Sequence, residues 1–263
     1  MHADSPFSTA VVGATGGAGA TRLSLEAAAS LAAAGHDVLV VDAAFATEGL
    51  SRHVEGRIDA DLTTLLCNPE RPLADACYDH PTVDAPGRVA LCPTFAPFER
   101  LARAKAPEAA QTLADRLVEA AHDFDYALVD TPPVAANQAV AAVTAADSRL
   151  VVLPPGERGV DALQRLRGRF ADVGVSADLV VANRVDPAAA PPDADYAVPE
   201  FRGPGLAAAE PDSPTAQTVA ALAGDCFGED LGTPEPTTAG ATVRRFATRS
   251  RTRARSTVRR LRR

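Results

Sequence analysis

A glycine-rich turn close to the N-terminus is the part of the sequence best suited to hold an anion. It follows the apolar run Ala10–Val12 and reads Gly13-Ala-Thr-Gly-Gly-Ala-Gly-Ala-Thr21. Glycines let backbone N–H groups curl around an anion, and the N-terminus of a helix that follows adds its dipole. The residues expected to line a phosphate site in this turn are Gly16, Gly17, Gly19, Ala20 and Thr21.

Three further polar residues, Asp42, Asp130 and Asn183, each follow a short run rich in valine and leucine. In an open parallel sheet, ligands bind at the carboxyl ends of the strands. Asp130 could hold Mg²⁺ through water there, or it could cap the loop that follows its strand. The same two interpretations apply to Asp42. The glycine turn and these three residues together indicate one ligand site at one edge of a sheet.

Apolar runs that alternate with helical stretches predict the elements that must position these residues. Strands that alternate with helices form a parallel sheet covered on both faces, so we expect a three-layer, doubly wound α/β fold. The predicted strands are Ala10–Val12, Val38–Val41, Arg88–Cys92, Tyr126–Val129, Leu150–Leu153 and Leu179–Ala182. The predicted helices are Thr21–Ala34, Pro107–His122, Val160–Asp172 and Pro214–Phe227. The segment Asp186–Asp195 is expected to be a loop.

Two known families carry a glycine turn of this kind after their first strand. The turn resembles both the Gly-Ala-Thr-Gly-x-x-Gly turn of short-chain dehydrogenases and the Lys-Gly-Gly-x-Gly-Lys-Thr loop of the ParA/MinD ATPases. The dehydrogenase alternative lacks support, because Lys105 is the only lysine and no Tyr-x-x-x-Lys pair exists. The segment Phe124–Pro133 resembles the ParA/MinD Walker B strand, which ends in Asp-Thr-Pro-Pro. Val180–Asp186 resembles the Asn-Arg adenine segment of that family.

The resemblance to ParA/MinD proteins covers roughly residues 8 to 228 and implies a P-loop NTPase that binds ATP and Mg²⁺. It places the adenine base between Asn183 and Pro199; for Asn183, a role in forming a turn is the structural alternative. It also assigns the metal to Thr21, Asp42 and Asp130. It further implies a role in chromosome partitioning or cell-division positioning, with a homodimer or a protein partner and no defined small-molecule substrate.

The sequence departs from the family pattern at three positions that serve catalysis. Thr15 and Ala20 stand where the family has its two lysines, and Ala44 stands where it has the carboxylate that orients water. A charge-assisted hydrogen bond contributes roughly 1.5–3 kcal/mol, and its loss weighs more in the transition state of phosphoryl transfer. We therefore assign no catalytic residue and expect a weakly binding or non-hydrolysing relative of the ATPases. The alternative is an active ATPase in which Arg22 or an arginine of a partner replaces the lysine.

Arg22 is the basic residue nearest to the phosphate loop in sequence, one position after Thr21. Its guanidinium could meet a phosphate through two hydrogen bonds. The other interpretation is a solvent-facing residue on the first turn of the helix. Arg22 is kept among the candidate nucleotide-binding residues.

The charge pattern divides the chain into a P-loop domain of residues 1–230, a linker of residues 231–242 and a basic tail of residues 243–263. Ten of the 26 lysines and arginines lie in residues 244–263, which hold no carboxylate. The tail resembles the membrane-binding C-terminal helix of MinD proteins in its place and charge. Contact with nucleic acid phosphates and loose association with the acidic body are the alternatives.

The rest of the composition bounds the cellular setting. The N-terminus lacks the basic start and apolar core of a secretory signal, and the four cysteines form no Cys-x-x-Cys pair. We therefore expect a cytoplasmic protein, with association to membrane or nucleoid through the tail. An acidic body with one lysine also suggests a salt-adapted, halophilic source.

Overall fold

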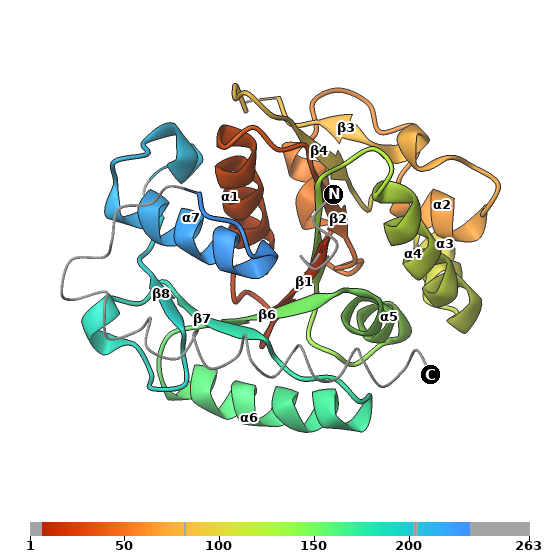
Figure 1. The fold of residues 1–263 in the computed structure, drawn as a ribbon. Coiled ribbons are helices and arrows are strands. Elements are labelled where there is room, and N and C mark those ends of the chain that lie inside the picture. Colours follow the sequence, from red (N-terminus) through yellow and green to blue (C-terminus); the bar gives the residue numbers. More distant parts are fainter. Residues whose placement is uncertain (1–6, 82, 202, 204, 232–263) are drawn as a thin grey trace, which may run out of the picture.

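The computed structural model describes residues 7–81, 83–201, 203 and 205–231, and the fold is that of an eight-stranded sheet with helices on both faces (Figure 1). The strand order is β3-β4-β2-β5-β1-β6-β7-β8. Every neighbouring pair is parallel except β3 and β4. The strands are β1 Ser8–Gly13, β2 Val38–Asp42, β3 Tyr78–Asp79, β4 Val89–Cys92, β5 Tyr126–Thr131, β6 Ser148–Leu153, β7 Leu179–Asn183 and β8 Tyr196–Val198.

Seven α-helices and four short 3-10 helices connect the described strands. The α-helices are α1 Ala20–Ala33, α2 Leu62–Cys67, α3 Phe98–Ala104, α4 Pro107–Ala120, α5 Asn137–Ala145, α6 Glu157–Asp172 and α7 Pro214–Phe227. The 3-10 helices are η1 Gly49–His53, η2 Leu73–Ala76, η3 Pro187–Ala189 and η4 Ala207–Ala209. No helix in the described part of the chain is both long and apolar enough to cross a bilayer.

The three layers follow from the alternation of side chains along the central strands. Val11 of β1 packs into the cluster that contains the apolar faces of α1 and α7. Its neighbours Ala10 and Val12 point the other way, into a cluster with α6. Because successive side chains of a strand point to opposite faces, strands covered on both sides must be apolar throughout. Figure 1 shows α1 and α7 on one side of the sheet and α6 on the other.

The predicted fold class is confirmed, but several elements were not anticipated. The helices α2, α3 and α5 and the strands β3 and β8 are absent from the sequence-based prediction. The segment Asp186–Asp195, predicted to be a loop, contains η3 before β8 begins at Tyr196. These elements are short, and short elements carry too few periodic positions to stand out from a loop. The predicted linker, apart from Leu231, and the whole basic tail lie outside the described residues.

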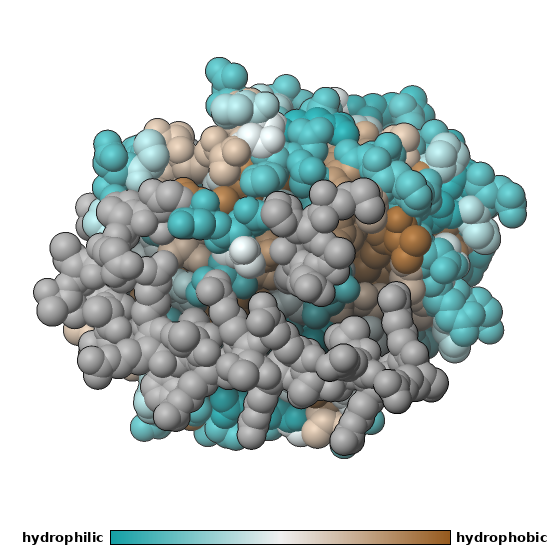
Figure 2. Space-filling view, viewed as in Figure 1, coloured by the Kyte–Doolittle hydropathy of each residue, from teal (hydrophilic) through white to brown (hydrophobic). Residues whose placement is uncertain are grey.

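A shallow groove lies between α4 and α5. Hydrophilic residues cover much of the described surface in Figure 2, and apolar side chains gather between these two helices. The groove has a volume of about 420 Å³ and is lined by small side chains that include Ala114 and Ala141. It lies outside the glycine loop and the adjoining strand ends.

Candidate nucleotide site

The glycine turn forms a loop that leads directly into α1, as the sequence predicts. Gly17 and Gly19 have φ angles of 74° and 94°, which side-chain-bearing residues rarely adopt. Gly19 is the N-cap of α1, and no side chain caps the helix at this end. The first N–H groups of a helix have no partner within it, so an uncapped N-terminus next to a glycine loop suits a phosphate group.

The end of β7 is pressed against this loop. Asn183 is 2% exposed, and its Nδ2 donates a hydrogen bond of 2.9 Å to the carbonyl of Ala18. A Cβ atom on Gly19 would lie 2.3 Å from the same Nδ2, and the φ of 94° is one that side-chain-bearing residues rarely adopt, so both favour glycine there. The other side-chain atom, Oδ1, is buried without a hydrogen-bond partner among the described residues. A buried acceptor without a partner costs free energy, which a donor group of a ligand would recover.

Thr21 and Asp130 meet beneath the loop. The hydroxyl of Thr21 donates a hydrogen bond of 2.5 Å to Oδ2 of Asp130, which is 1% exposed. Burial and, after it, the negative charge of Asp42 raise the pKa of Asp130 to about 7, although the hydrogen bond from Thr21 acts to lower it. The carboxylate of Asp130 therefore sits in a place where a nearby cation would be stabilising.

Asp42 lies beside Asp130, because the two residues are direct partners of the parallel strands β2 and β5. Its carboxylate accepts hydrogen bonds of 2.9 Å from the N–H of Ala44 and 3.2 Å from the N–H of Leu50. Burial raises the pKa of Asp42 to about 6, and these backbone hydrogen bonds act against the rise. Asp42 thus shapes the loop after β2, which is the structural role that the sequence left open.

The loop after β2 folds back onto the first turn of α1. A Cβ atom on Gly49 would lie 3.2 Å from the hydroxyl oxygen of Thr21, so the loop backbone is in contact with the first turn of α1. Glu48, one residue earlier, has a positive φ of 47°. No local sequence pattern predicts this contact, because it depends on the path of the chain between β2 and α2.

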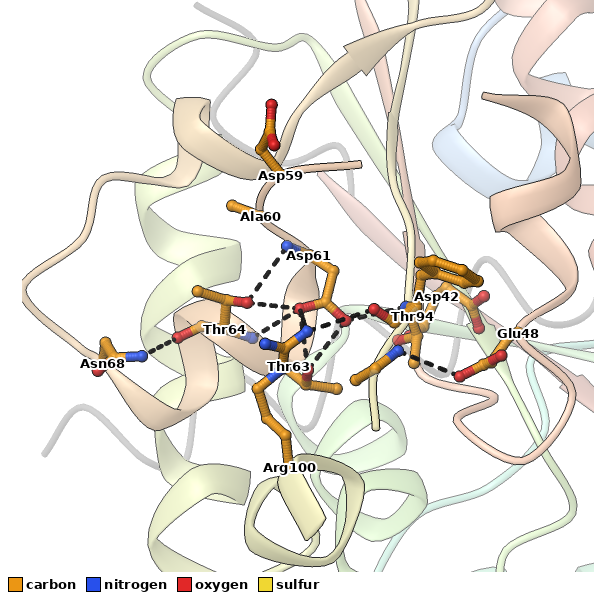
Figure 3. A network of polar contacts seen from close by, with 12 residues as sticks. Asp42, Glu48, Asp59, Ala60, Asp61, Thr63, Thr64, Asn68, Thr94 and Arg100 are labelled. Atoms are coloured by element: carbon orange, nitrogen blue, oxygen red, sulfur yellow. Dashed lines mark hydrogen bonds and ion pairs between the residues drawn. The ribbon is translucent and has the colours of Figure 1, made fainter. Parts of the chain in front are cut away.

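A polar network around Asp61 fixes the loops next to Asp42 (Figure 3). Asp61 is 1% exposed and caps α2 by accepting from the N–H of Thr64 at 2.9 Å. It also accepts from the N–H of Phe95 at 2.9 Å and pairs with Arg100 at 3.4 Å. Sequence reasoning missed Asp61, although an Asp three residues before a Thr is a capping pattern that could have indicated it.

The same region connects to Asp42 through the loop after β4. The hydroxyl of Thr94 donates a 2.8 Å hydrogen bond to the carbonyl of Asp42. The N–H of Ala96 donates to Oε1 of Glu48 at 3.2 Å. The loop after β4 therefore holds the loop after β2 at both Asp42 and Glu48 (Figure 3).

The side chain of Arg22 does not lie where a contact with phosphate at the glycine loop would require it. Its Nε donates a 2.7 Å hydrogen bond to Oε1 of Glu26, whose side chain is fully buried. Its terminal nitrogen donates to the carbonyl of Gly205, and its guanidinium lies 5.1 Å from the centre of the Phe201 ring. The side chain therefore binds the segment after β8 instead of pointing into the glycine loop.

Pro199 follows β8 directly, and the pairing of Asn183 with Val198 brings it to the same edge of the sheet as Asn183. Thr15 and Ala20 bring no cation to the loop, and Lys105 is the C-cap of α3. No group of three or more His, Cys, Asp or Glu side chains in the described residues could hold a metal by itself. The hydroxyl of Thr21 and the carboxylates of Asp42 and Asp130 nevertheless fit Mg²⁺, which prefers oxygen ligands and shares its shell with water and phosphate.

A family model described as an AAA domain matches residues 8–177. The chain belongs to this AAA-domain family. No curated protein sequence matches the chain. Its fold is that of the ParA/MinD-type P-loop ATPases, which confirms the family resemblance drawn from the sequence.

Three solved structures show this likeness. The septum site-determining protein MinD of Pyrococcus horikoshii, complexed with Mg-ADP, has a TM-score of 0.62 and 21% identity over 82% of this chain and 94% of its own. A ParA family ATPase of Chlorobium tepidum has a TM-score of 0.66 and 18% identity over 83% and 98%. The MinC:MinD cell division complex of Aquifex aeolicus has a TM-score of 0.66 and 20% identity over 88% and 100%.

Proposed function

We propose that this protein binds an adenine nucleotide with Mg²⁺ and hydrolyses it slowly or not at all. The observation that carries the proposal is the edge between the glycine loop and β7. There no side chain caps the N-terminus of α1, and the buried Oδ1 of Asn183 lacks a partner among the described residues. The first suits an anion and the second suits an amino group, as found together in an adenine nucleotide. The likeness to a MinD protein complexed with Mg-ADP supports the choice of ligand.

Weak hydrolysis is inferred from the charges that this site lacks. Phosphoryl transfer depends on positive groups that stabilise charge on the transferred phosphoryl group and the leaving oxygen. Ala20 offers none, and Ala44 offers no carboxylate to orient water. When bound, Mg²⁺ would supply one positive group, held by Thr21 and the acidic pair. The loss of these groups would therefore weaken nucleotide binding less than it slows hydrolysis.

The proposed cellular role is that of a positioning protein in chromosome partitioning or cell division, which acts through a protein partner or a second copy of the chain. The process and the partner come from likeness in fold to the ParA-family and MinC:MinD structures. A nucleotide that is bound but not turned over would serve such a role as a fixed structural ligand. The active-ATPase alternative through Arg22 gains no support, because its guanidinium is held by Glu26 and Phe201.

Calorimetry with ATP and MgCl₂, together with a phosphate-release assay, tests the proposal. We expect saturable ATP binding by the wild-type protein and turnover close to background. Ala20→Lys restores the missing cation and should tighten ATP binding by about tenfold or more, as a charge-assisted hydrogen bond does. Ala171→Lys adds the same charge at an exposed position in the last turn of α6 and serves as the control. Absence of ATP binding, rapid wild-type turnover, or tight binding of NADPH instead would each contradict the proposal.

A further inference from the structure

Arg184 is the basic residue that the fold brings onto the phosphate loop. Its terminal nitrogen donates a hydrogen bond to the carbonyl of Gly17. A Cβ atom on Gly19 would lie 3.9 Å from the same nitrogen. We propose that Arg184 supplies, from the end of β7, part of the positive charge for nucleotide phosphates that Thr15 and Ala20 do not supply. The inference rests on the proposed nucleotide binding and deepens it by naming the residue that recognises the polyphosphate group.

The backbone around Arg184 is held in an uncommon conformation. Arg184 has a φ of 59°, and Glu48 is the other non-glycine residue with positive φ in the described part of the chain. A side-chain-bearing residue in this region is strained by about 1–3 kcal/mol, and such strain concentrates at ligand sites. Both residues lie beside the glycine loop, one after β2 and one after β7.

The surrounding contacts maintain this conformation while the side chain stays exposed. Asn183 before it is fixed to Ala18 by its side chain, and the N–H of Val185 after it donates a 3.1 Å hydrogen bond to the carbonyl of Val198. The backbone on both sides of Arg184 is therefore pinned. Its side chain is exposed, so its donors remain accessible to a ligand.

The charge of Arg184 also differs from that of Arg22. Arg22 is neutralised by an ion pair of 2.7 Å with Glu26. Among the described residues, Arg184 has no ion pair with a carboxylate, and the group it contacts is the neutral Gly17 carbonyl. A guanidinium has five N–H donors and a planar shape that matches phosphate oxygens. Arg184 therefore retains both its charge and further donors for a phosphate group near Gly17.

The inferred ligand class is a nucleoside diphosphate or triphosphate, because the contact lies at the glycine loop. The experiment measures binding of ATP, ADP and adenosine by calorimetry to wild-type protein, Arg184→Ala and Arg184→Lys. We expect Arg184→Ala to weaken ATP and ADP binding about tenfold and to leave adenosine binding unchanged, since only the phosphates carry the charge it reads. Arg184→Lys should recover part of the loss, because it keeps the charge without the planar fork.

Arg165→Ala is the matched control, because it removes the same charge from the exposed surface of α6. It should leave all three affinities unchanged. Equal ATP affinity in wild type and Arg184→Ala overturns the inference while leaving the proposed function standing. An equal loss of ATP and adenosine binding also overturns it, since it would mean that Arg184 only shapes the loop. Absence of nucleotide binding by the wild type overturns the proposed function and the inference with it.

Discussion

At the scale of single residues, the two buried carboxylates of the site stand out for their electrostatic cost. Asp42 and Asp130 are direct neighbours on adjacent parallel strands, and both are almost fully buried. Burial and the negative charge of Asp42 raise the pKa of Asp130 to about 7, and burial raises the pKa of Asp42 to about 6. A site that keeps such a pair without an arginine or lysine between them is suited to a divalent cation.

The stability of the ligand-free protein should therefore fall as pH rises. The folded-state pKa of Asp130, about 7, lies above its ordinary value of 3.8. A raised pKa gives stability that is present below the ordinary value and is lost as pH rises through the folded value. Asp130→Asn removes the ionisation, so its gain in unfolding free energy over wild type should grow between pH 4 and pH 8, to roughly 3–4 kcal/mol. Urea unfolding at a series of pH values measures this.

Asp161→Asn, on the exposed surface of α6, provides the control for a change of one carboxylate. Its effect on unfolding free energy should stay within about 0.5 kcal/mol at every pH. If the difference in unfolding free energy between Asp130→Asn and wild type stays constant from pH 4 to pH 8, the pKa of Asp130 is not raised in the folded protein. MgCl₂ is left out of these measurements, because a bound cation would favour the ionised form.

At the scale of elements, the contact between α1 and the segment after β8 depends on one buried acid. Glu26 lies inside α1 with a fully buried side chain, and burial raises its pKa. One of its oxygens accepts from Arg22 at 2.7 Å and the other from the N–H of Ala207 at 2.7 Å. Through these bonds α1 holds the chain that follows Pro199, so the position of this segment is coupled to that of α1.

A double-mutant cycle on Arg22→Ala and Glu26→Gln should reveal this coupling. Removal of Arg22 leaves a buried carboxylate without its counter-charge, which is strongly destabilising. Glu26→Gln keeps an acceptor for Ala207 but removes the charge, so the double variant should lose less than the sum of the single losses. We expect a coupling energy of about 1–2 kcal/mol by urea unfolding.

The ion pair of Arg71 with Asp75 is the matched control, because it has the same spacing of four residues. Its side chains are 47% and 37% exposed, so solvent screens it. The cycle on that pair should give a coupling energy below about 0.5 kcal/mol. A coupling energy below about 0.5 kcal/mol for the Arg22–Glu26 pair would show that this ion pair does not stabilise the packing of α1 against the segment after β8.

At the scale of the whole molecule, the acidic body and the basic tail carry opposite charge. The residues from 244 to 263 carry ten arginines and no carboxylate, and they lie outside the described residues. A polycationic segment attracts anionic lipids and nucleic acids by releasing their counterions, and salt weakens this attraction. An acidic body would repel the same surfaces, so any such binding must come from the tail.

Truncation after Gly240 tests whether the tail binds anionic lipids or nucleic acids. The full chain should co-sediment with anionic vesicles or with DNA at low salt, and residues 1–240 should stay in the supernatant, because all ten tail arginines are removed. Raising KCl towards 1 M, where the Debye length is about 3 Å, should release the full chain. Vesicles and DNA are assayed separately, so that each kind of surface gives its own result. Equal sedimentation of the two forms would instead favour association of the tail with its own body.

Much of the fold and the core of the site were predictable because local patterns encode them. The glycines of the loop were predicted to form a phosphate site, and Gly17 and Gly19 adopt the positive φ that glycine permits. The strand ends at Asp42, Asp130 and Asn183 were also predicted to meet, since parallel strands align their carboxyl ends. Asp61 was missed, because its role depends on partners such as Phe95 and Arg100 that are distant in sequence.

The sequence by itself determined the long helices, the six central strands of a parallel sheet and the missing cations of the phosphate loop, because local residue patterns encode each of them. Only the tertiary structure decided which arginine reaches the loop. Arg22 is next to Thr21 in sequence, yet its side chain leaves the site to pair with Glu26. Arg184 is far away in sequence, yet β7 delivers it to Gly17. Adjacency along a helix fixes neither the direction of a long side chain nor its partners, and packing decides both.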